Sequence, residues 1–196
     1  MTPNPVKRMS LEEYFEFDKN AEGNFEYFNG EVLEMSGVSV EHSSIELNLA
    51  LLIAPRAREL GCQAFSANFR VKPASVLTYR YPDLTVACGK AEFVDISGLQ
   101  CLANPVLIVE VLSDSTEQYD RGGKFREYKS IETFQEYLLV SSTTVSVTLI
   151  QKRDERFWFH SDYVAGETFH LNTLDLDIAV EDLYQGLDLI SLRPRP

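Results

Sequence analysis

The sequence predicts a mixed α/β fold, an α+β arrangement in which helices flank a central mixed β-sheet and a helix and a β-hairpin come first. Three stretches predict it. Val106 to Leu112 is an aliphatic and β-branched run, interrupted only by Glu110, and is typical of a strand covered on both faces. An apolar stripe at helical spacing follows His42. Asn29-Gly30, between two apolar runs, is the strongest short signal for a hairpin.

Length and charge limit the classes of protein. With 196 residues, 44% of them hydrophobic, the chain can bury one core, so we expect a single domain over residues 1–196. The net charge of −12 excludes a general attraction to nucleic acid or anionic membranes, so phosphate binding would need local cations or a metal. Cys62, Cys88 and Cys101 form no CxxC pair, which predicts reduced thiols in a cytoplasmic protein. The absence of a signal peptide and of a long apolar run predicts no membrane association.

The N-terminal third is expected to form a helix, a hairpin and a second helix. Ser10 and Glu13 form a capping box for a helix over residues 11–19. In the hairpin, Glu26 should lie opposite Leu33 and Phe28 opposite Glu31, which places both glutamates on one face. That face is either solvated or functional. The apolar stripe of the second helix consists of Ile45, Leu49, Leu52 and Ile53. Pro55 should kink or restart this helix, and Gly61 should end it.

Strands dominate the rest of the predicted order. We expect strands at 63–72, 84–87 and 106–112, with a loop at 89–104. A helix capped by Asp120 should follow at 121–130, although Gly122-Gly123 requires either a loose helix start or a close approach of the backbone to something. Further strands are expected at 136–140, 145–151 and 157–159, and a closing helix at 178–187.

Two carboxylates and a lysine are the candidate chemical groups. The sequence has no GxSxG, P-loop, GxGxxG or HExxH motif, and its histidines are scattered. Asp83 precedes one strand, Glu110 lies in the next apolar strand, and Lys124 lies in the following helix. Carboxylates on neighbouring strands can hold a hard divalent cation, and a lysine beside them can stabilise charge on a phosphate. Asp83 could equally be a turn residue and Glu110 the partner of an arginine, while His42 could be a hydrogen-bonded helix end.

The order of these motifs resembles a known nuclease family. Pro82-Asp83 followed by Glu110 resembles the PD-(D/E)XK nuclease signature. More closely, FEYFNGEVLEMSG, YPDLTVACG, PVLIVEVLSDST and YDRGGKFREYKSIETFQEYLLV resemble, in this order, the Uma family of restriction-endonuclease-like proteins, over most of residues 10–150. The resemblance implies a restriction-endonuclease-like core. It also implies a metal-dependent endonuclease that hydrolyses DNA phosphodiester bonds by in-line attack of water.

The resemblance also implies roles for single residues. Asp83 and Glu110 would bind Mg²⁺ or Mn²⁺, with the backbone carbonyl of Val111 as a third ligand. The signature expects a lysine at position 112, where this chain has Leu112, and the resemblance implies that Lys124 supplies the missing ammonium from the helix.

Two further sets of residues belong to the same hypothesis. Glu31 and His42 match family positions near the site, which implies that they are accessory groups, either in the outer shell or at a second metal. Arg80, Arg121 and Arg126 are candidate phosphate contacts or ordinary surface residues. We expect DNA as substrate and a homodimer. One alternative is a catalytically silent nuclease fold that acts as a binding or regulatory protein. Another is a small α+β interaction or oligomerisation module, in which Glu110 and Lys124 form a buried ion pair.

Overall fold

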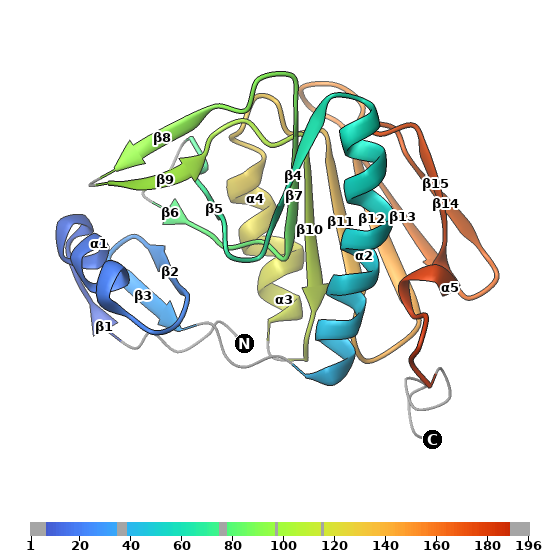
Figure 1. The fold of residues 1–196 in the computed structure, drawn as a ribbon, viewed down its shortest axis with the longest axis horizontal. Helices are drawn as coiled ribbons and strands as arrows, with labels where there is room; N and C mark the ends of the chain where they lie inside the picture. The colour runs from blue at the N-terminus through green and yellow to red at the C-terminus, as the bar shows by residue number, and fades with distance from the viewer. Residues whose placement is uncertain (1–6, 35–38, 75–77, 97, 115, 189–196) are drawn as a thin grey trace.

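The computed structural model describes residues 7–34, 39–74, 78–96, 98–114 and 116–188, and a six-stranded mixed sheet lies at its centre (Figure 1). β10 and β11 are parallel, and the other neighbouring strands are antiparallel. The predicted mixed α/β fold is therefore confirmed. In spatial order the strands are β13 (Trp158–Val164), β12 (Ser146–Lys152), β11 (Glu136–Ser141), β10 (Leu107–Leu112), β7 (Leu84–Cys88) and β4 (Cys62–Ser66).

β10 is the buried centre of this sheet, and all of its residues are buried. Its odd-numbered residues pack with α2 (Val40–Glu59) and α5 (Val180–Leu183) on one face. Ile108 and Leu112 pack on the other face with Phe125 and Tyr128 of α4. Figure 1 shows α2 in front of the sheet and α4 behind it. This double coverage explains why the strand is apolar at nearly every position.

The N-terminal elements form a second sheet beside the first, in the order β1-β3-β2-β6 (Figure 1). The capping box of Ser10 and Glu13 starts α1, and the hairpin has the predicted register, with Glu26 opposite Leu33. Positive φ angles of 46° at Asn29 and 91° at Gly30 form its turn. The elements are β1 (Lys7–Arg8), α1 (Leu11–Asn20), β2 (Phe25–Phe28), β3 (Glu31–Glu34) and β6 (Thr78–Tyr79).

α2 continues through Pro55 without a restart and ends before Gly61, whose φ is 71°, as the sequence predicted for Gly61. The predictions for residues 63–72 and 89–104 were wrong. The strand predicted at 63–72 divides into β4 and β5 (Arg70–Val71), because a turn closed by the Phe69 amide and the Ser66 carbonyl interrupts it. β5 then joins β8 (Phe93–Ile96) and β9 (Leu99–Leu102) in a small sheet that occupies the predicted loop at 89–104.

The second half also differs in its helices. The helical segment after β10 comprises α3 (Glu117–Tyr119), the π-helical turn η1 (Asp120–Lys124) and α4 (Phe125–Tyr128). It starts before the predicted 121–130, so Asp120 lies inside it and is no cap. The closing helix predicted at 178–187 is confirmed only for the short α5, because residues 178–179 belong to β15 (Leu176–Ala179), which pairs with β14 (Thr168–Leu171). The turn at Asp175, with φ 45°, favours this hairpin. β13 extends well beyond the predicted 157–159.

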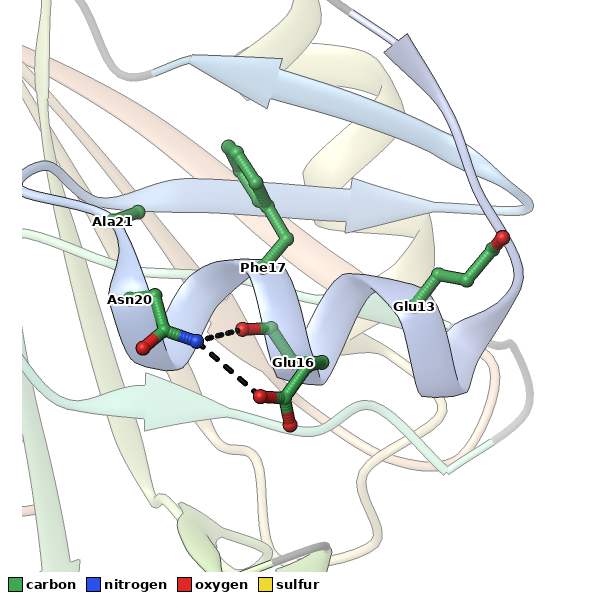
Figure 2. A pocket seen from close by; sticks show the side chains of 5 residues that line it. All are labelled: Glu13, Glu16, Phe17, Asn20 and Ala21. Carbon is green, nitrogen blue, oxygen red and sulfur yellow. Dashed lines mark hydrogen bonds between the residues drawn. The ribbon is translucent and has the colours of Figure 1, made fainter.

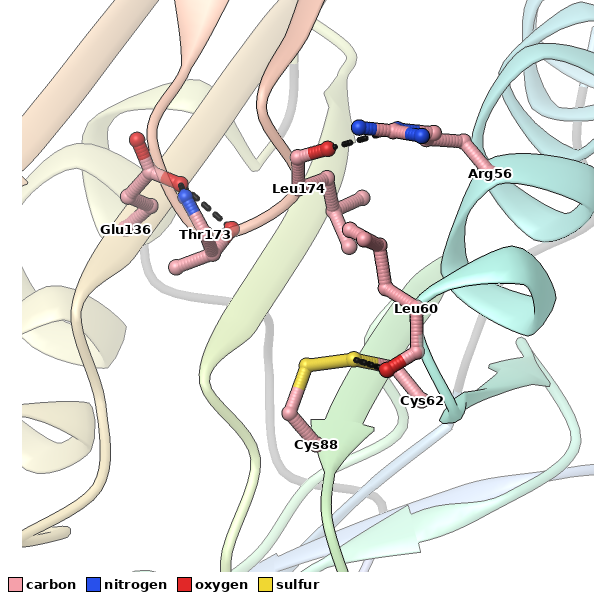
Figure 3. The surroundings of a disulfide bond; sticks show 7 residues. All are labelled: Arg56, Leu60, Cys62, Cys88, Glu136, Thr173 and Leu174. Atoms are coloured by element: carbon pink, nitrogen blue, oxygen red, sulfur yellow. Dashed lines mark hydrogen bonds between the residues drawn. A yellow bond between two sulfur atoms is a disulfide. The ribbon is translucent and has the colours of Figure 1, made fainter.

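A disulfide joins Cys62 of β4 to Cys88 of β7, which are register partners, with Cα atoms 4.0 Å apart (Figure 3). The prediction of reduced thiols is therefore wrong for this pair, because strand pairing brings together two cysteines that are distant in sequence. Cys101 is free and buried. The disulfide follows the C-terminal end of α2, whereas His42 lies in its first turn, so the length of a 20-residue helix separates them.

In the part of the chain that the structure describes, no helix has both the length and the apolar character needed to cross a lipid bilayer.

Candidate active site

Asp83 and Glu110 come together because β7 and β10 are antiparallel neighbours. The ladder pairs Val109 with Leu84, so the next residues, Glu110 and Asp83, follow side by side at the same end. The Asp83 carboxylate continues the ladder: its Oδ2 accepts a hydrogen bond of 2.5 Å from the Val111 amide. Asp83 is thus held in place by backbone. The contact with Val111 uses its amide, whereas the sequence predicted a role for its carbonyl as a metal ligand.

Lys124 reaches Glu110 from the helical segment that covers this face of the sheet. Its Nζ lies 3.1 and 3.2 Å from the two carboxylate oxygens of Glu110. The same ammonium lies 3.0 Å from Oδ1 of Asp120 and 3.4 Å from Oε1 of Glu26. The Tyr128 hydroxyl donates to Oε1 of Glu110 at 2.9 Å. Three buried carboxylates therefore share one buried ammonium.

The excess of carboxylates over ammonium groups shifts the pKa values in this cluster. Burial alone would lower the pKa of Lys124, but Asp120, Glu110 and Glu26 outweigh it and raise that pKa well above its usual value. Burial, together with Asp120, Asp83 and Glu26, raises the pKa of Glu110, and Lys124 offsets only part of this. The surroundings thus favour the charged form of Lys124 and disfavour the charged form of Glu110.

Arg80 stabilises the cluster from inside the protein. Its side chain is fully buried. It donates to Glu26 at 2.9 Å, to both oxygens of Glu127 at 2.9 and 3.0 Å, and to the Tyr119 hydroxyl. The prediction of a phosphate contact is therefore corrected for Arg80, because a fully buried guanidinium with these partners cannot reach a substrate phosphate.

His42 meets Asp83 on its other side. Nε2 of His42 lies 3.2 Å from Oδ1 of Asp83, and both side chains are buried. Burial alone would lower the pKa of His42, but Asp83, Glu46 and Asp120 raise it. Glu46, one helical turn further on, has its pKa raised by burial and by Asp83. His42 is thus a hydrogen-bonded group in the first turn of α2 and also a neighbour of the predicted site.

The other predicted accessory residues lie elsewhere. Glu31 pairs with Arg8 at 2.7 Å on the hairpin. Arg121 pairs with Glu117 at 2.7 Å and donates to Thr148 at 3.0 Å. Arg121 and Arg126 are exposed, so both remain available to a ligand.

Three carboxylates of the cluster were not among the predicted site residues. Glu26 was noticed only as one of two acids on a hairpin face, and Glu46 and Asp120 were not considered as site groups. Helical spacing could have identified two of them. Glu46 lies four residues after His42, and Asp120 lies four residues before Lys124.

A pocket on the surface of α1 does not belong to this cluster. It is lined by Glu13, Glu16, Phe17, Asn20 and Ala21 (Figure 2). Asn20 donates to the Glu16 carbonyl at 2.8 Å and to its carboxylate at 3.3 Å. None of these five residues has a cationic side chain.

Comparison with known proteins shows the family of this chain. The model of the Uma2 family, described as "Putative restriction endonuclease", matches residues 11–181. The chain belongs to the Uma2 family. Two uncharacterized proteins of Synechocystis sp. (strain ATCC 27184 / PCC 6803 / Kazusa) are similar to it. One, slr1290, is 36% identical over 93% of this chain and 95% of its own length. The other, sll1609, is 32% identical over 78% of this chain and 86% of its own length.

A solved structure shares the fold of this Uma2 member. It is the crystal structure of a putative nuclease belonging to DUF820 from Anabaena variabilis ATCC 29413. The two chains superpose with a TM-score of 0.71 over 90% of this chain and 97% of the other, at 16% sequence identity. The Uma2 chain thus has a nuclease-like fold.

Proposed function

We propose that this protein is a metal-dependent endonuclease that hydrolyses phosphodiester bonds in DNA. One observation carries the proposal: the Lys124 ammonium lies 3.1 Å from Glu110, although it comes from a helix and not from the strand. The strand position of the signature lysine is Leu112, which is buried on the face that Ile108 shares. Lys124 therefore brings an ammonium to Glu110 from the helix, where the signature would have a lysine on the strand.

The residues present fit a divalent cation, because the carboxylates of Asp83 and Glu110 lie at the same end of two neighbouring strands and offer oxygen ligands. A bound cation would polarise the phosphate and lower the pKa of a water molecule. Asp83, oriented by the Val111 amide, would be its fixed protein ligand. Glu110 would join the cation or hold Lys124 in place, and Lys124 would donate to the oxygen on which negative charge develops. The exposed Arg121 and Arg126 would contact the DNA backbone.

Cleavage of supercoiled plasmid DNA with Mg²⁺ or Mn²⁺ tests the proposal. We expect Lys124→Ala to lower the rate on the order of 10²–10³-fold. Lys129→Ala, which removes an exposed lysine five residues further on, is the matched control and should keep full activity. Leu112→Lys in the Lys124→Ala background should restore part of the rate, because the graft projects from the same strand face as Glu110. Full activity of a folded Lys124→Ala protein would overturn the assignment.

Lys124→Ala leaves three buried carboxylates without their shared cation, so unfolding curves must accompany every rate. Asp83→Asn gives a second, independent variant for the same test. It preserves the shape of the side chain and still accepts the Val111 amide. A folded Asp83→Asn protein should bind DNA and fail to cleave it; cleavage at the wild-type rate would contradict the proposal.

A silent nuclease fold that acts as a binding module is the second candidate. The observation that favours it is the engagement of both Glu110 oxygens by Lys124. Under this alternative the pair is structural, and Glu110→Gln should destabilise the protein by roughly 3–5 kcal/mol. Under the nuclease proposal, stability should stay level or rise, because the raised pKa of Glu110 reflects a charge that the fold disfavours.

A further inference from the structure

A second set of potential metal ligands lies on the side of Asp83 where His42 contacts it, and this set does not include Glu110 or Lys124. His42, Glu46 and Asp83 each offer one ligand atom, and these atoms all lie within 4.8 Å of one another. A metal ion bound to three donors at 2.0–2.6 Å needs donors about this close together. We propose that His42, Glu46 and Asp83 bind a divalent transition-metal ion, of the Mn²⁺ or Zn²⁺ class.

The backbone fixes the positions of these donors. His42 and Glu46 are four residues apart on α2, so both side chains project from one face of the helix toward β7. A spacing of four residues on a helix is the one by which HExxH motifs present two ligands to one metal. Asp83 is oriented by the Val111 amide and by His42. Of the three side chains, only Glu46 is partly exposed, so it can change its conformation to reach a metal ion.

Charge supports a cation at this place. Asp83 and Glu46 are neighbouring carboxylates, and within the described part of the chain no lysine or arginine forms an ion pair with either of them. Glu110, by contrast, already has an ammonium on both oxygens. A cation between Asp83 and Glu46 would relieve their repulsion without displacing Lys124, whereas a cation between Asp83 and Glu110 would compete with it.

The donor types specify the class of metal. Mg²⁺ prefers oxygen ligands in octahedral geometry, whereas imidazole nitrogen suits first-row transition metals. One imidazole and two carboxylates leave further positions for water, as catalytic sites require. The inference deepens the proposed nuclease function and rests on it for the use of the metal. It differs from the sequence-based expectation in replacing Glu110 and the Val111 carbonyl by His42 and Glu46.

Titration calorimetry of the metal-free protein with Mn²⁺, Zn²⁺ or Mg²⁺ alone tests the site. We expect one tight Mn²⁺ or Zn²⁺ site per chain and weaker Mg²⁺ binding. Glu46→Gln should weaken Mn²⁺ binding at least about tenfold. Glu59→Gln, which removes an exposed carboxylate from the last turn of the same helix, is the matched control and should change nothing. In the pulsed electron paramagnetic resonance spectrum of bound Mn²⁺, nitrogen coupling should be present and should vanish in His42→Ala.

The outcomes separate this inference from the proposed function. Unaltered Mn²⁺ binding in folded Glu46→Gln, or loss of binding in Glu110→Gln alone, would overturn the ligand set and leave the nuclease proposal standing. Absence of Mn²⁺ and Zn²⁺ binding to the wild type would also overturn it. Binding at His42, Glu46 and Asp83 without any DNA cleavage would support this site and defeat the proposed function.

Discussion

Glu26 shows how a single residue joins the N-terminal hairpin to the candidate site. It contacts Lys124 at 3.4 Å and Arg80 at 2.9 Å, and it accepts the Tyr81 amide at 3.3 Å. The sequence predicted the strand and even the partner of Glu26 in the hairpin. It could not predict these contacts, because they arise only when the hairpin docks against segments more than 50 residues away. Asp83, Glu110 and Lys124, by contrast, could be proposed from the sequence, because each lies in a short motif and these motifs follow one another in the order typical of the family.

The pKa of Glu26 leads to a prediction for acid stability. Burial alone would raise that pKa, but Lys124 and Arg80 outweigh it and lower it below the usual 4.5. A carboxylate with a depressed folded pKa stabilises the fold fully above its unfolded pKa, and this stability is lost as pH falls through the folded pKa. Denaturant unfolding should thus show Glu26→Gln less stable at pH 7 by roughly 3 kcal/mol. Its stability should also vary less steeply with pH below 4.5.

Glu31→Gln is the matched control, since it changes an acid of the same hairpin that pairs with the exposed Arg8. Its free energy of unfolding should stay within about 0.5 kcal/mol of the wild type. If both substitutions changed the free energy of unfolding equally, the ion pairs of Glu26 with Lys124 and Arg80 would not stabilise the fold.

At the scale of elements, the π-helical turn η1 places Asp120 and Lys124 on the site. Its Gly123 lies against the ring of Tyr119, and a Cβ at this position would be 2.7 Å from Cδ2 of that ring. The close approach that Gly122-Gly123 suggested in the sequence is therefore confirmed at Gly123. Tyr119 in turn contacts Arg80 and Glu127, so η1, Arg80 and α4 form one packed unit.

The neighbouring glycine provides a sharp comparison. A Cβ at Gly122 would meet nothing within 4 Å. Gly122→Ala should therefore stabilise the protein by about 0.5–1 kcal/mol, because alanine favours helical backbone. Gly123→Ala should destabilise it by roughly 1–3 kcal/mol, because Tyr119 must move. Thermal unfolding of the two variants measures this difference, and equal melting temperatures would contradict the described packing of Tyr119.

Element prediction succeeded where one local pattern decided the structure. The capping box, the Asn29-Gly30 turn and the strand at 106–112 each have such a pattern. The prediction failed where pairing with a distant segment of the chain determines the structure, as in the small sheet of β5, β8 and β9. The helix predicted at 178–187 forms only as α5, because Ile178 and Ala179 pair with β14 as part of β15.

The disulfide between β4 and β7 has a direct test. Cys62 and Cys88 are joined, whereas Cys101 is free and buried. The protein unfolded without reductant should therefore react with a thiol reagent at one cysteine, and with reductant at three. Mass spectrometry of alkylated protein counts these sites. Three reactive thiols in the unreduced protein would restore the expectation drawn from the sequence.

The charge of the whole molecule determines how it can meet DNA. The chain carries −12, and the cations at the candidate site, Lys124 and Arg80, are buried in ion pairs. Under the proposed function, the exposed Arg121 and Arg126 remain the candidates for phosphate contacts. Because the acidic site repels phosphate, we expect weak DNA affinity in EDTA and a marked gain when Mn²⁺ is added.

The salt dependence of this binding can be predicted from the number of contacts. Each neutralised phosphate contributes about −0.9 to the slope of log K against log salt concentration on duplex DNA, so two arginines predict a slope near −2. Arg126→Gln should reduce its magnitude by about 1 and weaken binding similarly on all sequences. Lys19→Gln, an exposed position on α1, should leave the slope unchanged. Fluorescence anisotropy with a labelled duplex in EDTA measures the slope without cleavage. A slope near −6 would mean that surface cations besides Arg121 and Arg126 also contact the DNA backbone.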